Sequence, residues 1–99
     1  MSTRVRRSSG NVFRDLGFDA EEAENLRLRS ELMIQIRSLI ERRNLTQTAA
    51  AKLFGVTQPR VSDLVGGRIN LFSIDALVKM LARAEVRVQL VLKRKSQVA

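Results

Sequence analysis

Cysteine and histidine are both absent from the 99-residue sequence. Without cysteine the chain forms no disulfide and offers no thiolate, and without histidine it lacks the commonest general base and metal ligand. Three glutamates lie close together at Glu21, Glu22 and Glu24, but the acidic first turn of a helix explains them better than a pair of catalytic carboxylates does. We therefore expect no enzyme, no catalytic residue, no metal site and no cofactor.

Aromatic residues are scarce at 4%, and neither tryptophan nor tyrosine occurs. The core must then consist mainly of leucine, isoleucine, valine and alanine, a composition that favours helices. No apolar run approaches the roughly 20 residues of a membrane span, and the opening MSTRVRRSSG lacks the apolar segment of a signal peptide. This length has room for one core, so we expect a single all-α domain in the cytoplasm, with no membrane partner.

Positive charge is abundant and unevenly distributed, giving a net charge of +8 at pH 7. Residues 1–41 hold seven arginines against seven carboxylates, whereas residues 42–99 hold eleven lysines and arginines against three carboxylates. The whole net charge therefore belongs to the second part of the chain, which favours a polyanionic partner. The alternative is a basic surface that serves only solubility.

The first part of the chain divides into an arm, an apolar anchor and a long helix. Residues 1–11 have almost nothing to bury and are interpreted as a flexible basic arm. A short apolar anchor follows at residues 12–18. Asp19, followed by acidic residues, predicts a helix that runs to about Arg43. Its apolar positions recur at three- and four-residue steps: Leu28, Leu32, Met33, Ile36, Leu39 and Ile40.

Three shorter helices are predicted after the long one. Asn44 suits the left-handed residue that ends a helix, and Thr46 then caps a helix that closes on Gly55. Thr57 caps the next helix, which closes on the following pair of glycines. Ser73 opens the last helix, whose buried side is expected to contain Ile74, Leu77, Val78 and Leu81.

Residues 86–95 have the alternating pattern of a β-strand. One side carries Val86, Val88, Leu90 and Leu92. Since no other segment has strand character, we expect this strand to pair with the same strand of a second copy, antiparallel about a two-fold axis, in a homodimer. Two alternatives stay open: a tail that pairs with nothing or with a different protein, and a dimer mediated by helices.

The stretch TQTAAAKLFGVTQPRVSDLVGG, residues 46–67, has the spacing of a helix-turn-helix. We expect Ala50 at the closest approach of the two helices, with Val61 and Leu64 on the buried face of the second. Ala49, Ala51 and Lys52 are then exposed or partly exposed. The residues expected to point outward, or to lie at the leading end of the second helix, are Gln58, Pro59, Arg60, Ser62 and Asp63.

These outward residues suit DNA. Glutamine and arginine have the bidentate geometry that recognises adenine and guanine in the major groove, which predicts base contacts from Gln58 and Arg60. Pro59 is tolerated in the first helical turn, and Gln47 is placed to touch the DNA backbone and to brace Gln58. Lys52, Arg68 and Lys79 are expected to attract phosphates, and the free N–H groups at the helix start capped by Thr57 are expected to take phosphate oxygens. The alternative is a helical hairpin with an indifferent polar surface.

The segment LTQTAAAKLFGVTQPRVSDLVGGRINLFSIDALVKML, residues 45–81, resembles the Cro/C1-type (XRE) helix-turn-helix family. The resemblance implies a five-helix, lambda-repressor-like bundle over residues 12–85, bound to double-stranded DNA. It also implies that Gln47, Arg68 and Asn70 contact the DNA backbone, while Gln58 and Arg60 contact bases. Asn44 departs from the glycine common in the family, but asparagine tolerates the same conformation.

A narrower resemblance involves three segments: GNVFRDLGF before the motif, GGRINLFSIDALVKML after it, and the closing VRVQLVLKRK. All three are similar to segments of HigA-like antitoxins, which implies repression of the protein's own operon and binding of a RelE/HigB-type ribonuclease toxin. The expected toxin contacts are Val12, Phe13, Leu16 and Phe18, together with the arm. Alternatively, these residues only cover one end of the bundle, and Arg4, Arg6 and Arg7 of the arm enter the minor groove.

The function expected from the sequence is therefore a dimeric repressor that binds an inverted-repeat operator, the antitoxin of a toxin–antitoxin operon. One alternative is a stand-alone XRE-type regulator without a toxin. Another is a protein-binding module that neutralises a ribonuclease toxin and contacts DNA only secondarily. RNA binding is a weaker alternative because the aromatics used for base stacking are lacking.

Overall fold

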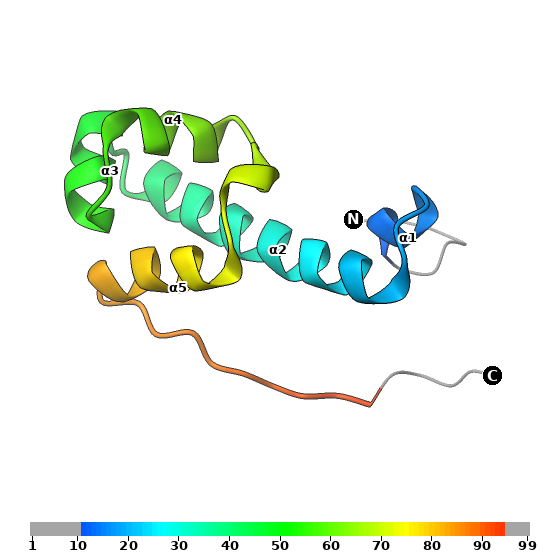
Figure 1. Ribbon diagram of the computed structural model, residues 1–99. Coiled ribbons are helices and arrows are strands. Elements are labelled where there is room, and N and C mark those ends of the chain that lie inside the picture. Colours follow the sequence, from blue (N-terminus) through cyan, green and yellow to red (C-terminus); the bar gives the residue numbers. More distant parts are fainter. Residues whose placement is uncertain (1–10, 95–99) are drawn as a thin grey trace.

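The longest helix, α2 (Ala20–Arg42), is the element against which the others pack. The computed structural model describes residues 11–94, which form five α-helices and one 3₁₀ helix. Figure 1 shows α3 and α4 at one end of α2, α1 at its other end, and α5 along its opposite side. The remaining elements are α1 (Val12–Asp15), α3 (Gln47–Phe54), α4 (Gln58–Val65), η1 (Ile69–Leu71) and α5 (Ile74–Arg83). The predicted all-α fold is confirmed for this part of the chain.

Short polar side chains begin the helices at the predicted places. Asp19 accepts a hydrogen bond from the backbone N–H of Glu22 at 2.8 Å, and Thr46 and Ser73 accept equivalent bonds at 3.0 Å. Each bond satisfies a donor that the first turn of a helix leaves without an intrahelical acceptor. Asn44 takes the predicted left-handed conformation with φ 54°.

Asn11 belongs to the folded domain and not to the arm predicted for residues 1–11. Its side chain caps α1 by accepting from the N–H of Phe13 at 2.9 Å, and its amide donates to the carbonyl of Ala23 at 3.1 Å. These bonds join α1 to the start of α2. The rest of the predicted arm, with Arg4, Arg6 and Arg7, lies outside the described residues.

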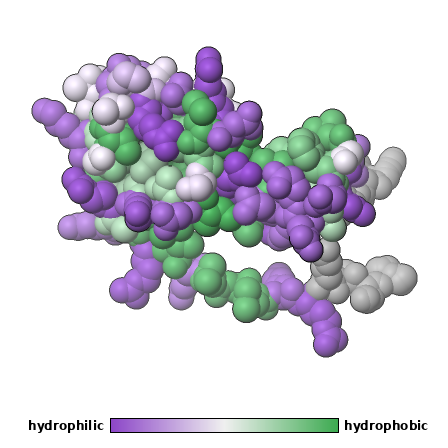
Figure 2. Space-filling model, in the orientation of Figure 1, coloured by the Kyte–Doolittle hydropathy of each residue, from purple (hydrophilic) through white to green (hydrophobic). Residues whose placement is uncertain are grey.

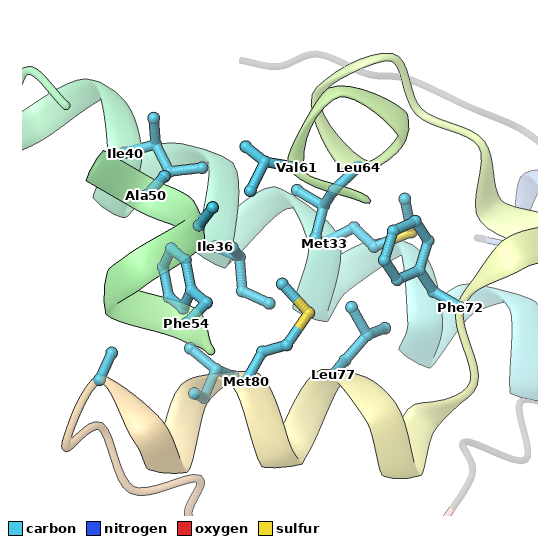
Figure 3. Packing of buried hydrophobic residues seen from close by; sticks show 13 residues of the cluster. Met33, Ile36, Ile40, Ala50, Phe54, Val61, Leu64, Phe72, Leu77 and Met80 are labelled. Atoms are coloured by element: carbon cyan, nitrogen blue, oxygen red, sulfur yellow. The ribbon is translucent and has the colours of Figure 1, made fainter. Parts of the chain in front are cut away.

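The core lies between α2, α3, α4 and α5 (Figure 3). Two phenylalanines, Phe54 and Phe72, are its largest fully buried side chains. The predicted inward residues Ala50, Val61 and Leu64 are also buried. The aliphatic residues that complete the core on α2 and α5 include Met33, Ile36, Ile40, Leu77, Met80 and Leu81. Cores of this kind stabilise a small domain mainly by removing apolar surface from water.

Some predicted inward positions are wrong. Leu28 is exposed whereas Leu26 is buried, because two residues rotate a helix by about 200° and place these side chains on different faces. Val78 is likewise more exposed than predicted. Ala51 is buried although we expected it to be exposed or partly exposed, since α3 packs against both α4 and α5.

The strand predicted for residues 86–95 does not form in residues 86–94, which have no regular secondary structure. A strand needs hydrogen bonds to a neighbouring strand, and residues 11–94 provide none. Val86 and Val88 are half-buried against the core, whereas Leu90 and Leu92 are 81% and 92% exposed. The segment runs back from the end of α5 toward the α1 side of the molecule (Figure 1).

No helix among residues 11–94 is long and apolar enough to cross a membrane.

Candidate nucleic-acid interface

The helix-turn-helix predicted for residues 46–67 is formed by α3, a tight turn and α4. Gly55 makes the turn with φ 71°, in the left-handed region that glycine enters without steric cost. Thr57 caps α4 by accepting from the N–H of Arg60 at 3.3 Å. Pro59 lies in the first turn, where its missing N–H breaks no helical hydrogen bond. The local sequence therefore fixes both the turn and the start of α4.

The two sides of α4 differ sharply in burial. Val61 and Leu64 point into the core, and both are almost fully buried. Gln58, Pro59 and Ser62 are exposed on the other side, as predicted, whereas Asp63 beside them is half-buried. Four polar or small side chains thus lie along a helix face that the rest of the described chain leaves open.

Gln58 is held by Gln47, the first residue of α3. The side-chain amide nitrogen of Gln58 donates a hydrogen bond to the side-chain carbonyl oxygen of Gln47. The predicted bracing contact between these residues is therefore present. Because the bond joins the starts of both helices, it limits the rotamers of Gln58 before any ligand arrives.

Arg60 lies in the first turn of α4, but its side chain folds back and does not project outward. Its Nη1 donates to the carbonyl oxygen of Leu71 at 2.7 Å, and its Cζ lies 4.1 Å from the ring centroid of Phe72. A charge-assisted hydrogen bond and a cation–π contact thus hold the guanidinium against the loop that follows α4. In this conformation Arg60 positions that loop.

Arg29 of α2 also holds this loop, and no role was predicted for it from the sequence. Its Nη1 donates to the carbonyl oxygens of Ile69 and Phe72 at 3.2 and 3.4 Å. A signal was present in the spacing, because Arg29 falls on the buried stripe that contains Leu26 and Met33. A cation at such a position needs buried acceptors, and the loop carbonyls supply them.

Other predicted DNA contacts lie around this face. Arg68 and Asn70, in the loop after α4, are both exposed, and Arg68 pairs with Asp63 at 3.8 Å. An exposed pair of this kind contributes little stability and can separate when a phosphate competes. Lys52 is exposed on α3, and Lys79 on α5 pairs with Asp75 at 3.4 Å.

The four predicted partner-binding residues gather around α1. Val12, Leu16 and Phe18 are exposed, and Phe13 is half-buried with its ring 6.4 Å from that of Phe18 in an edge-on arrangement. Figure 2 shows this apolar surface at the end of the molecule away from α3 and α4. Apolar surface of this kind suits a protein partner better than it suits DNA.

Comparison with known proteins bears on these features. The family model of a helix-turn-helix domain matches residues 12–93. A solved structure of an XRE family transcriptional regulator is similar, with a TM-score of 0.69 and 29% sequence identity. The similarity covers 79% of this chain and 88% of that chain. Comparison with curated proteins finds no significant match.

Proposed function

Since the chain belongs to the helix-turn-helix domain family and is a DNA-binding transcriptional regulator, we propose that it is a repressor that binds an inverted-repeat operator as a homodimer. We further propose that it is the antitoxin of a toxin–antitoxin operon. The observation that carries the operator-binding proposal is the hydrogen bond between Gln58 and Gln47. It presents one amide, already oriented, at the exposed start of the second helix of the motif.

Base recognition then depends on the open face of α4. Gln58 is suited to a bidentate contact with the N6 and N7 atoms of adenine. Asp63 and Ser62 lie further along the same face, and a carboxylate accepts from the N4 amino group of cytosine. Arg60 reaches guanine only if it leaves Leu71 and Phe72. Its present contacts favour a role in positioning the loop.

Phosphate contacts surround this face. Lys52, Arg68 and Asn70 are exposed and carry donors suited to phosphate oxygens. Lys79 is a further candidate on α5. The first turns of α3 and α4 begin at Thr46 and Thr57, and their backbone N–H groups also favour an anion. These contacts set the orientation of the protein on the duplex and make its affinity depend on salt.

Dimer formation is assigned to the segment after α5. Val86 and Val88 rest on the core, which leaves the exposed Leu90 and Leu92 for a second copy. Antiparallel pairing of residues 86–95 would supply the hydrogen bonds to a neighbouring strand that residues 11–94 do not provide. Two copies would then place their α4 helices on half-sites about 34 Å apart.

The antitoxin proposal is supported by the apolar surface around α1. Leu16 is 69% exposed, and Val12 and Phe18 flank it. Burying such side chains against a partner contributes roughly 25 cal/mol per Å² of apolar area. Without that partner, the chain is a stand-alone regulator. If the partner is the primary target, the chain is a toxin-neutralising module that contacts DNA secondarily.

Fluorescence anisotropy tests the operator proposal. The chain is titrated against a duplex from its own upstream region and against a scrambled duplex, each at low and near-physiological salt. We expect a preference of about 10³ or more for the native duplex that persists at the higher salt. Equal affinities that fall together with salt would contradict sequence-specific repression and indicate nonspecific attraction to a polyanion.

A further inference from the structure

A cleft of about 550 Å³ lies beside the motif, between the α3–α4 turn and α5. Its apolar lining includes the half-buried Val56 and the buried Phe54 and Met80, and Figure 3 shows Phe54 and Met80 next to each other in the core. Three cations, Arg60, Lys79 and Arg83, also line it. The volume falls within the range of small-molecule sites, which is roughly 300–1,000 Å³.

The charges at the cleft are of one sign. None of its lining residues is acidic, although Lys79 pairs with Asp75 outside the lining at 3.4 Å. Within residues 11–94, the side chain of Arg83 makes no hydrogen bond or ion pair. Its guanidinium folds over Gly55, so close that a Cβ built on this glycine would lie 2.8 Å from Cζ. The cleft therefore presents guanidinium donors above an apolar floor.

We propose that this cleft binds a small amphipathic carboxylate, with the carboxylate at Arg83 and the apolar part on the half-buried Val56 and Ala76 and the exposed Ala82. A carboxylate accepts two parallel hydrogen bonds from a guanidinium, and the floor offers apolar area that a DNA phosphate cannot use. The C-terminal segment of a second copy is a poorer occupant, because Arg87, Lys93 and Arg94 give it the same charge as the rim.

The cleft is connected to the DNA-binding face through Arg60. This side chain lines the cleft and also donates to Leu71 in the loop that carries Arg68 and Asn70. A carboxylate in the cleft competes for the guanidinium of Arg60 and loosens its hold on that loop. The site then weakens operator binding when it is filled, an effect that rests on the proposed function.

Calorimetry with hexanoate, octanoate and decanoate, each below its micellar concentration, tests the site without DNA. We expect each added methylene to tighten binding about fourfold until the apolar floor is covered. Octanol should bind at least about tenfold more weakly than octanoate, because it lacks the charge. Amide resonances of Gly55, Val56 and Ala76 should shift when octanoate binds. Absence of binding, or equal affinity for octanol and octanoate, would overturn the proposal.

Two variants locate the carboxylate. Arg83→Gln should weaken octanoate binding about tenfold or more. Arg42→Gln, at the exposed end of α2 and not part of the cleft lining, should leave octanoate binding unchanged. Equal effects of the two substitutions would contradict the assignment to Arg83. If octanoate fails to bind and Arg83→Gln instead weakens binding to all duplexes alike, the cleft belongs to the DNA backbone contact and the carboxylate site is wrong.

Anisotropy on the native duplex, with and without saturating octanoate, tests the coupling to DNA. We expect octanoate to weaken duplex binding about threefold or more in the wild type and to have no effect in Arg83→Gln. If octanoate binds and the affinity for the duplex stays unchanged, the proposed coupling to DNA is wrong, whereas the proposed octanoate site still holds. Octanoate binding in a chain with no duplex preference would instead overturn the proposed function.

Discussion

The two ends of α2 present surfaces of opposite character. At the α3–α4 end, residues 47–65 expose no large apolar side chain, and the exposed Gln58 is held by its hydrogen bond to Gln47. At the α1 end, Val12, Leu16 and Phe18 are exposed around a single short helix. The surface at the α3–α4 end is suited to a polar partner, because the hydrogen bond between Gln47 and Gln58 already orients the Gln58 side chain. The surface at the α1 end is suited to a partner that removes apolar area from water.

The largest difference between the two ends is expected when one aromatic ring is removed from each. Phe54 is 1% exposed and Phe18 is 44% exposed. We expect Phe54→Ala to lower the free energy of unfolding by about 3–5 kcal/mol, because it leaves a cavity between α3 and α5. Phe18→Ala should cost about 1 kcal/mol or less, since half of the ring already meets water. Urea denaturation measures both, and similar losses would mean that α1 supports the fold as much as the core does.

Substitutions in residues 86–94, which run from the end of α5 toward the α1 side of the molecule, should have the next largest effect. Replacing Leu90 and Leu92 together by lysine should weaken the proposed homodimer at least about a hundredfold, because each copy would lose two apolar contacts. Val91→Lys is the matched control, since Val91 lies on the other side of the alternation and is also exposed. Analytical ultracentrifugation gives the dimer dissociation constants. An unchanged dimer in the double variant would favour a helix-mediated interface.

Base recognition at the α3–α4 end should depend on one amide. Gln58→Ala is expected to lower discrimination at one base pair by about 1–3 kcal/mol, with binding to a scrambled duplex nearly unchanged. Gln47→Ala should produce a smaller loss of the same kind, because it removes the hydrogen bond that orients Gln58 but leaves the Gln58 side chain in place. Gln35→Ala, exposed on α2, is the control. Anisotropy against operators with single base changes separates these cases, and an unaltered preference in Gln58→Ala would contradict its role.

How far the sequence predicts this molecule depends on the range of the interactions. Thr46, Thr57 and Ser73 cap the helices where the sequence predicts them, because a cap involves only neighbouring residues. Arg60 depends on Phe72 and Leu71, eleven or more residues away along the chain, and helical spacing cannot reveal such partners. For Arg29 the helical spacing indicates a position on the buried stripe, but it does not reveal the carbonyls of Ile69 and Phe72, which lie 40 and 43 residues away. The strand predicted for residues 86–95 needs a neighbouring strand, which residues 11–94 do not provide, so its alternating pattern does not determine whether it forms.

The smallest effect is expected from Arg68, an exposed cation in the loop after α4. Arg68 pairs with Asp63 across 3.8 Å, and both side chains meet solvent. Arg68→Ala should therefore leave the free energy of unfolding within about 0.5 kcal/mol of the wild type. Binding to every duplex should weaken by a similar factor, and the slope of log affinity against log salt should fall by about one for each copy bound. A loss of affinity confined to operators changed at one base pair would instead indicate that Arg68 contacts a base. The proposed base-contacting surface would then include the loop after α4, which Arg29 and Arg60 hold, as well as α4 itself.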